Sequence, residues 1–128
     1  MSRREIRVPG LAEPISHYTD AVRAGDLLFV SGCIAVDGDE RLVGGDDVVA
    51  QTRQVFANLE AVLAAGGATL GDVVKVTVFL TDIGERAAVN EVRAERFGPA
   101  RPASTLVEVS KLAVEGARVE IEAVALVP

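Results

Sequence analysis

Residues Pro102–Val127 read PASTLVEVSKLAVEGARVEIEAVALV, two extended runs joined by a short polar loop. The second run alternates with the period of a β-strand. One of its faces carries only aliphatic side chains, which are Val119, Ile121, Ala123, Ala125 and Val127. The opposite face carries two carboxylates and two aliphatic side chains, Glu120, Glu122, Val124 and Leu126. A core face does not tolerate unpaired carboxylates, and a solvated face does not need aliphatic side chains, so this face is expected to meet another chain or line a cleft.

The length and composition predict one small domain with surplus apolar surface. A chain of 128 residues has the length of a single domain, here residues 1–128. Hydrophobic residues make up 49% of the chain and aromatic residues only 4%, so the core is expected to be aliphatic. The mean hydropathy of +0.30 is high for a small monomer, whose surface is large relative to its volume. We therefore expect a buried contact between subunits.

Charge and cysteine content exclude several classes of protein. The net charge is −6 and the basic residues are scattered, which argues against a nucleic-acid partner. No apolar run approaches the roughly 20 residues of a membrane span, and the first ten residues lack the apolar core of a signal peptide. Cys33 and His17 are the single cysteine and histidine, too few for a disulfide or a common zinc motif. The expectation is a cytoplasmic protein with no metal, no cofactor and no membrane contact.

Two segments have the apolar spacing of amphipathic helices. The first is expected to begin at Asp46 or Asp47 as N-cap, to carry its apolar stripe over residues 48–63 with Gln51 away from it, and to end at Gly66-Gly67. The second is expected to follow Asp82, with Glu85 at the capping-box spacing, and to end before Gly98.

The remaining segments read as strands. Residues 21–24 and 27–34 flank Gly25-Asp26 and predict a hairpin, and Gly32 inside the second strand predicts a bulge or a close backbone approach. In residues 74–80, Val74, Val76 and Val78 share one face. Residues 4–8 alternate weakly and are expected to form a short edge strand, so the predicted order is β, β, β, α, β, α, β, β. This order indicates an α+β fold, a mixed sheet of about six strands with two helices on one face and symmetry copies covering the other.

Four stretches together resemble the Rid (reactive intermediate deaminase) family, also called YjgF, from about Pro14 onward. They are LLFVSG at residues 27–32, residues 51–83, AAVNEV at residues 87–92 and VEIEAVAL at residues 119–126. The resemblance implies a chorismate-mutase-like fold, a homotrimer whose sheets line a central barrel, and a small-molecule cleft at each subunit interface. It also implies hydrolysis of reactive enamines and imines, such as 2-aminoacrylate, to 2-keto acids and ammonia without a cofactor.

The same resemblance assigns roles to individual residues. Glu120 in VEIEA matches the carboxylate that positions or activates the attacking water, and is the expected catalytic residue. Tyr18, Ser31 and Asn90 match polar side chains that line the cleft and contact the substrate. Each has an ordinary structural alternative: an interface ion pair for Glu120, a half-buried tyrosine, a serine bonded to backbone, and a solvated helix asparagine.

One departure from the family pattern bears directly on activity. Deaminating members carry a Pro-Ala-Arg-Ser run whose arginine grips the substrate carboxylate as a bidentate fork. Here the run is Pro102-Ala103-Ser104-Thr105, so the substrate-anchoring arginine is missing and Ser104 stands in its place. Ser104 and Thr105 offer only hydroxyl groups. Arg101 is close in sequence but precedes the proline.

Three functions remain open at this point. The first is hydrolysis of an imine or enamine with poor activity on 2-aminoacrylate and 2-iminopropionate, because Ser104 replaces the arginine. The second is a module that binds a metabolite or a partner protein without turnover. The third is the endoribonuclease or translation-inhibitor role described for some relatives, which the acidic charge disfavours.

Overall fold

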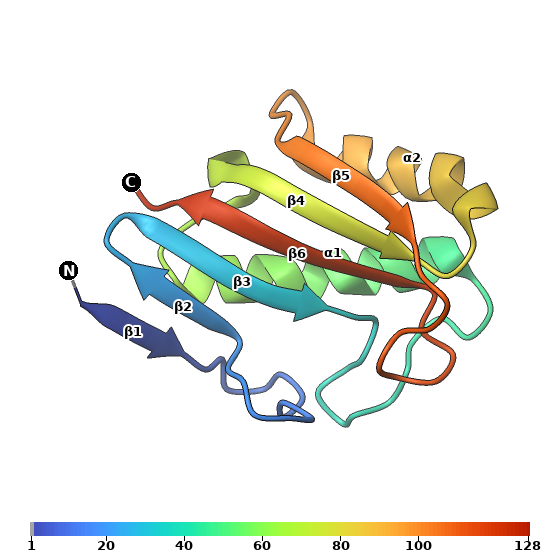
Figure 1. Cartoon of the computed structure of the whole chain (residues 1–128), viewed down its shortest axis with the longest axis horizontal. Coiled ribbons are helices and arrows are strands. Elements are labelled where there is room, and N and C mark those ends of the chain that lie inside the picture. Colours follow the sequence, from blue (N-terminus) through green and yellow to red (C-terminus); the bar gives the residue numbers. More distant parts are fainter. Residues whose placement is uncertain (1) are drawn as a thin grey trace.

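The alternating segments assemble into one sheet, with both helices packed on one of its faces (Figure 1). This computed structural model describes residues 2–128. The strands are β1 (Arg3–Ile6), β2 (Ala21–Ala24), β3 (Leu27–Cys33), β4 (Val73–Leu80), β5 (Ala103–Glu108) and β6 (Val119–Leu126). The helices are α1 (Val48–Ala65) and α2 (Arg86–Phe97), and two short 3₁₀ turns are η1 (Leu70–Asp72) and η2 (Ile83–Glu85).

The strand order across the sheet is β1-β2-β3-β6-β4-β5. β4 and β5 pair in parallel through the α2 crossover, and all other neighbours pair antiparallel. α1 connects β3 to β4, and the last strand, β6, inserts between them to make a split β-α-β unit. The predicted element order and the α+β fold class with two helices on one face are confirmed.

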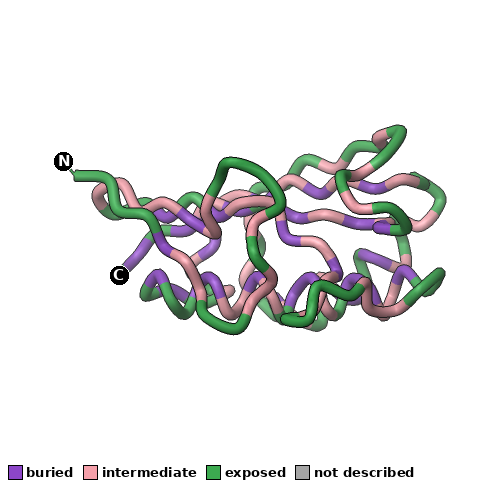
Figure 2. The backbone as a smooth tube through the Cα atoms, turned by 90° about the horizontal axis from the view of Figure 1, so that it is seen from below, coloured by how far each residue is buried: buried purple, intermediate pink, exposed green. Residues whose placement is uncertain are grey.

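The core lies between the sheet and the helices, and Figure 2 shows buried stretches in both layers. Every second residue of β6 from Val119 to Ala125 is buried, as its alternation predicts. Phe56 of α1 and Phe97 of α2 meet edge to face with ring centroids 5.5 Å apart. This contact ties the two helices together across the sheet.

The ends of α1 follow from its capping residues. The Asp47 carboxylate accepts hydrogen bonds from the backbone N–H groups of Val49 and Ala50 at 2.9 and 3.2 Å, which confirms an N-cap at this position. Gly66 caps the other end, and Gly67 follows with φ +86°, a left-handed conformation that favours glycine.

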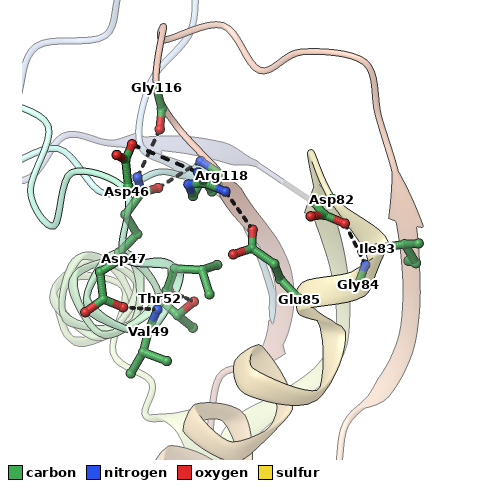
Figure 3. A network of polar contacts seen from close by, with 12 residues as sticks. Asp46, Asp47, Val49, Thr52, Asp82, Ile83, Gly84, Glu85, Gly116 and Arg118 are labelled. Atoms are coloured by element: carbon green, nitrogen blue, oxygen red, sulfur yellow. Dashed lines mark hydrogen bonds and ion pairs between the residues drawn. The ribbon is translucent and has the colours of Figure 1, made fainter.

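A polar network at the start of α1 corrects two expectations (Figure 3). Gln51 is fully buried rather than solvated, because its amide donates to the carbonyls of Gly45 and Gly116 and accepts from the backbone N–H of Arg118. Glu85 does not complete a capping box; its carboxylate accepts a hydrogen bond from Arg118 at 3.1 Å. The network joins α1, η2 and the loop before β6.

Two bulges shift the alternation of side chains. The register between β4 and β6 changes at Val73/Lys75, so Val74 is exposed instead of sharing the buried face of Val76. The register between β3 and β6 changes between Val30 and Cys33, which confirms the irregularity expected at Gly32.

The sheet face away from the helices keeps large apolar side chains. Phe29, Val107 and Leu126 are exposed there, on three different strands. Glu120 and Glu122 lie among them on β6, opposite Phe79 and Thr77 of β4. Within residues 2–128, no helix is both long and apolar enough to cross a membrane.

Candidate active site

Glu120 stands on the open face of the sheet, on the central strand β6. Its carboxylate is half-buried. Burial raises the pKa of this carboxyl, and the nearby negative charge of Glu122 raises it further. A carboxylate whose pKa lies above its ordinary value is a better proton acceptor near neutral pH.

Gly32 provides the space that this carboxylate occupies. A Cβ atom built on Gly32 would clash with the Glu120 carboxylate group. The bulge in β3 and the missing side chain therefore allow Glu120 to lie against the backbone of β3. The sequence motif VSG carried this information, because a glycine inside a strand marks such a close approach.

A loop held by Arg7 brings Tyr18 to the same end of β3. The Arg7 guanidinium donates to the Asp20 carboxylate at 2.6 Å and to the carbonyls of Leu11 and Ala12, and the bond to Asp20 raises its pKa. Tyr18 is 49% exposed, and its hydroxyl accepts a long hydrogen bond of 3.4 Å from the Ile15 backbone. Its phenol is therefore available to a ligand.

Ser31 and Tyr18 line a cavity of about 240 Å³ with Gly32, Cys33 and Asn58. The Ser31 hydroxyl donates its proton to the Thr19 carbonyl at 2.6 Å. This is the backbone-bonded serine that the sequence left open as the structural alternative. The hydroxyl oxygen keeps its capacity to accept a hydrogen bond. Glu120 is not among the residues that line this cavity, although it lies directly beside Gly32.

Cys33 contributes a buried thiol to the cavity wall. Burial raises its pKa to about 12, and the charges of Asp20 and Glu120 act in the same direction. The thiol is therefore protonated at neutral pH and does not serve as a nucleophile.

The other expected site residues lie at the far edge of the sheet. Asn90 is exposed on α2, and Arg101 is exposed just before the edge strand β5. Ser104 pairs with the buried Val76 and so faces the helix layer, whereas Thr105 pairs with Thr77 on the open face. The Thr105 hydroxyl accepts a hydrogen bond from Lys75 Nζ at 2.7 Å.

Arg93 is the residue at this edge that the sequence did not reveal. It lies on α2, three residues after Asn90, and its guanidinium donates to Ser104 Oγ at 2.8 Å. Its spacing from Asn90, which puts both on one helix face, was the available signal. Nothing in the sequence showed that this side chain reaches across to β5.

The candidate residues thus form two groups that a single chain does not bring together. Tyr18, Ser31 and Glu120 form the β3/β6 group. Asn90, Arg93, Arg101, Ser104 and Thr105 form the α2/β5 group. β4 separates β6 from β5, a distance of roughly 10 Å at the usual strand spacing. Glu120 and Ser104 also face opposite sides of the sheet.

Metal-binding side chains are not clustered in the part of the chain that the structure describes. Among residues 2–128, no three His, Cys, Asp or Glu side chains are grouped so that they could hold a metal ion.

Comparison with known proteins gives consistent likenesses along almost the whole chain. Residues 10–127 match the family model described as Endoribonuclease L-PSP. A RutC family protein of Pyrococcus horikoshii is 45% identical over 88% of this chain and 89% of its own length. A 2-iminobutanoate/2-iminopropanoate deaminase of Dermatophagoides farinae is 34% identical over 98% of this chain and 97% of its own.

A solved structure supports the same placement. The crystal structure of RidA from an Antarctic Psychrobacter matches with a TM-score of 0.91 and 34% identity, over 97% of this chain and 99% of that one. This likeness confirms the expected YjgF-type, chorismate-mutase-like fold. With the family model covering residues 10–127 and relatives similar over nearly their full length, the chain belongs to the Rid family, also known as the YjgF or RutC family.

Proposed function

We propose that this protein is a homotrimer that hydrolyses a small 2-imino acid, or its enamine form, in a cleft between subunits. The observation that carries the proposal is Glu120, a half-buried carboxylate with a raised pKa that is held against Gly32 beside Tyr18 and Ser31. The relative named as a 2-iminobutanoate/2-iminopropanoate deaminase supports the substrate class.

The reaction consumes one water and releases ammonia. Glu120 accepts a proton from the water as its oxygen attacks the imine carbon, and a C–O bond forms while the C=N double bond becomes a single bond. The imine nitrogen takes up one proton during this addition, with the Tyr18 hydroxyl as the proposed donor, and Glu120 then returns the proton of the water to the amino group. The C–N bond breaks as the hydroxyl of the intermediate loses its proton and restores the donor, which releases ammonia and gives the 2-keto acid.

The separation of the two groups of residues supports a cleft between subunits. The β3/β6 group holds the candidate base, and the α2/β5 group holds the hydroxyl, amide and guanidinium donors. If the edge strand β5 of one subunit approaches β3 and β6 of its neighbour, both groups face one ligand. The exposed apolar side chains of the open face, Phe29, Val107 and Leu126, favour such an assembly because it removes them from water.

Ser104 is expected to slow turnover of the smallest imines. In deaminating relatives the arginine of the Pro-Ala-Arg-Ser run fixes the substrate carboxylate from the strand itself. A displacement of about 1 Å between the reacting carbon and its base can cost about 100-fold in rate. We therefore expect lower turnover of 2-iminopropionate and 2-aminoacrylate than in relatives that keep the arginine.

The test generates 2-iminopropionate and 2-iminobutanoate in situ from alanine and 2-aminobutanoate with an amino-acid oxidase, and follows 2-keto acid release. We expect slow but measurable acceleration of imine hydrolysis that Glu120→Gln abolishes and Glu122→Gln retains. Equal rates for the wild type and Glu120→Gln would show that Glu120 is not the base. Fast turnover of 2-iminopropionate would contradict the effect assigned to Ser104.

A binding module without turnover is the second candidate, and Ser104 is the observation that favours it. The same cleft would hold a small metabolite or a partner protein. The two candidates differ in one result: a ligand that binds equally well to the wild type and Glu120→Ala, with no product from either, identifies a binding module. The family description names an endoribonuclease, but a net charge of −6 disfavours an RNA substrate.

A further inference from the structure

We propose that Arg93, reaching from α2 to the Ser104 position, binds the carboxylate of the ligand and replaces the arginine that is missing from β5. The identity of the ligand as a 2-imino or 2-keto acid rests on the proposed function. The assignment of Arg93 itself rests on four features of its surroundings: its bond to Ser104, its free donors, its lack of a counter-ion and its place beside Asn90.

The first feature is the contact with Ser104. One terminal nitrogen of Arg93 donates to Ser104 Oγ at 2.8 Å. Because Ser104 faces the helix layer, the guanidinium of Arg93 reaches the Ser104 position from the helix side of the sheet. Ser104, which stands in place of the family's arginine on β5, is thus also the residue that accepts a hydrogen bond from Arg93 on α2.

The second feature is the number of free donors. A guanidinium carries five N–H donors in a planar fork, and Ser104 accepts only one of them. Two of the remaining donors can bind the two oxygens of a carboxylate side by side. Ser104 would act as a positioning residue that orients this fork.

The third feature is a partly buried charge without a counter-ion. Within residues 2–128, Arg93 makes no ion pair, whereas Arg53 and Arg96 pair with Glu95 and Glu60. Its neighbours one helical turn away, Val89, Asn90, Arg96 and Phe97, include no carboxylate. Desolvation by burial lowers the pKa of Arg93. An incoming anion would compensate this lost hydration.

The fourth feature is the arrangement of its neighbours. Asn90 lies on the same face of α2, three residues earlier, and can donate to the same ligand. Among residues 2–128, Arg101 is exposed before β5 and bonds no hydroxyl group, and Lys75 bonds Thr105 on the opposite side of the sheet. Arg93 is therefore a better anchor than Arg101.

An anchor on a helix differs from an anchor on a strand in its effect on kinetics. The carboxylate is still held by a charge-assisted pair, so binding is retained. The reacting carbon approaches Glu120 from a different position, so kcat is lower than with the strand arginine. This distinction reconciles ligand binding through Arg93 with the slow turnover expected from Ser104.

The experiment measures binding of 2-oxobutanoate, a 2-keto acid that cannot be deaminated, by isothermal titration calorimetry of the full-length protein. Arg93→Gln is expected to weaken binding at least about 10-fold, the loss typical of a charge-assisted hydrogen bond. Arg53→Gln is the matched control, because it removes the same charge from an exposed ion pair on α1 and is expected to leave binding unchanged.

Moving the guanidinium from Arg93 to position 104 distinguishes a role of Arg93 in ligand binding from a role in the structure alone. The double variant Arg93→Gln/Ser104→Arg moves the guanidinium from α2 to β5 and is expected to recover wild-type affinity and to raise kcat on 2-iminopropionate. Arg93→Lys is expected to retain part of the affinity. A merely structural role for Arg93 would not be rescued by Ser104→Arg.

Each outcome is decisive for this inference and is distinct from the outcome for turnover. Unchanged affinity in Arg93→Gln, or no 2-oxobutanoate binding by the wild type, overturns the assignment of Arg93 whatever the imine assay shows. Arg93-dependent binding without imine turnover supports the anchor but rejects hydrolysis, and leaves the binding module.

Discussion

The Glu120 carboxylate lies so close to Gly32 that a Cβ atom on Gly32 would overlap it. This contact joins β6 to the bulge of β3 and fixes where the candidate base can point. The clashing atoms belong to the end of a flexible side chain, so an alanine can be accommodated if the carboxylate moves.

Gly32→Ala is therefore expected to impair function more than stability. Thermal unfolding should show a loss at the low end of the roughly 1–3 kcal/mol typical of overpacking, because a side-chain end relaxes more cheaply than packed backbone. Imine turnover should fall to near the level of Glu120→Gln. Gly71→Ala is a suitable control, since its nearest contact for a Cβ is an ordinary 3.7 Å. Full activity in Gly32→Ala would mean that the position of Glu120 is unimportant.

The pKa of Glu120 should depend on its neighbour. Burial is the larger cause of its rise and Glu122 the smaller, so Glu122→Gln should lower the pKa of Glu120 without returning it to the ordinary 4.5. Carbon-13 NMR titration of the side-chain carboxyl measures both values. A pKa that is identical in the wild type and Glu122→Gln would rule out the interaction between the two charges.

The same raised pKa has a defined sign for stability. In the folded protein Glu120 keeps its proton to a higher pH than in the unfolded chain. Glu120 therefore lowers the stability of the fold as the pH rises from 4.5 through its raised pKa. Glu120→Gln should accordingly raise the melting temperature at pH 7, and the gain should disappear below pH 4.5. A gain that grows as the pH falls would contradict the burial of this carboxyl.

Gln51 explains part of what the sequence could not show. Periodicity placed α1 correctly but assigned a polar residue to the solvated side, because hydrophobic patterning cannot recognise a buried amide with backbone partners. The register shift that exposes Val74 was likewise not visible in the alternation of the strand. Arg93 was missed because alternation gives the face of a residue but not the reach of a long side chain. The order of the elements along the chain, the two helices and the irregularity at Gly32 were predictable from local patterns, whereas the order of the strands across the sheet was not.

Replacing Gln51 by leucine should be strongly destabilising. The change keeps the volume but leaves the carbonyls of Gly45 and Gly116 and the N–H of Arg118 without their partner. We expect a loss of about 2–4 kcal/mol in unfolding free energy, from several buried unsatisfied groups. Gln54→Leu on the same helix is the control, since Gln54 bonds one side chain, Asn58. Equal losses in both variants would contradict the importance of the network.

The Cys33 thiol is expected to be inert in the folded protein. A pKa of about 12 leaves almost no thiolate at pH 8, and burial restricts access. A thiol reagent such as DTNB should react with one equivalent only after denaturation. Rapid labelling of the native protein would show that the cavity beside β3 opens to solvent.

The most direct test of the cleft asks whether Tyr18 and Asn90 meet across two subunits. Both side chains are exposed, and they belong to the β3/β6 and α2/β5 groups that one chain keeps apart. A Tyr18→Cys/Asn90→Cys double variant treated with a short bis-maleimide should give covalent dimers and trimers on a denaturing gel. Each single variant should remain monomeric. A double variant that also remains monomeric would contradict a site built between subunits.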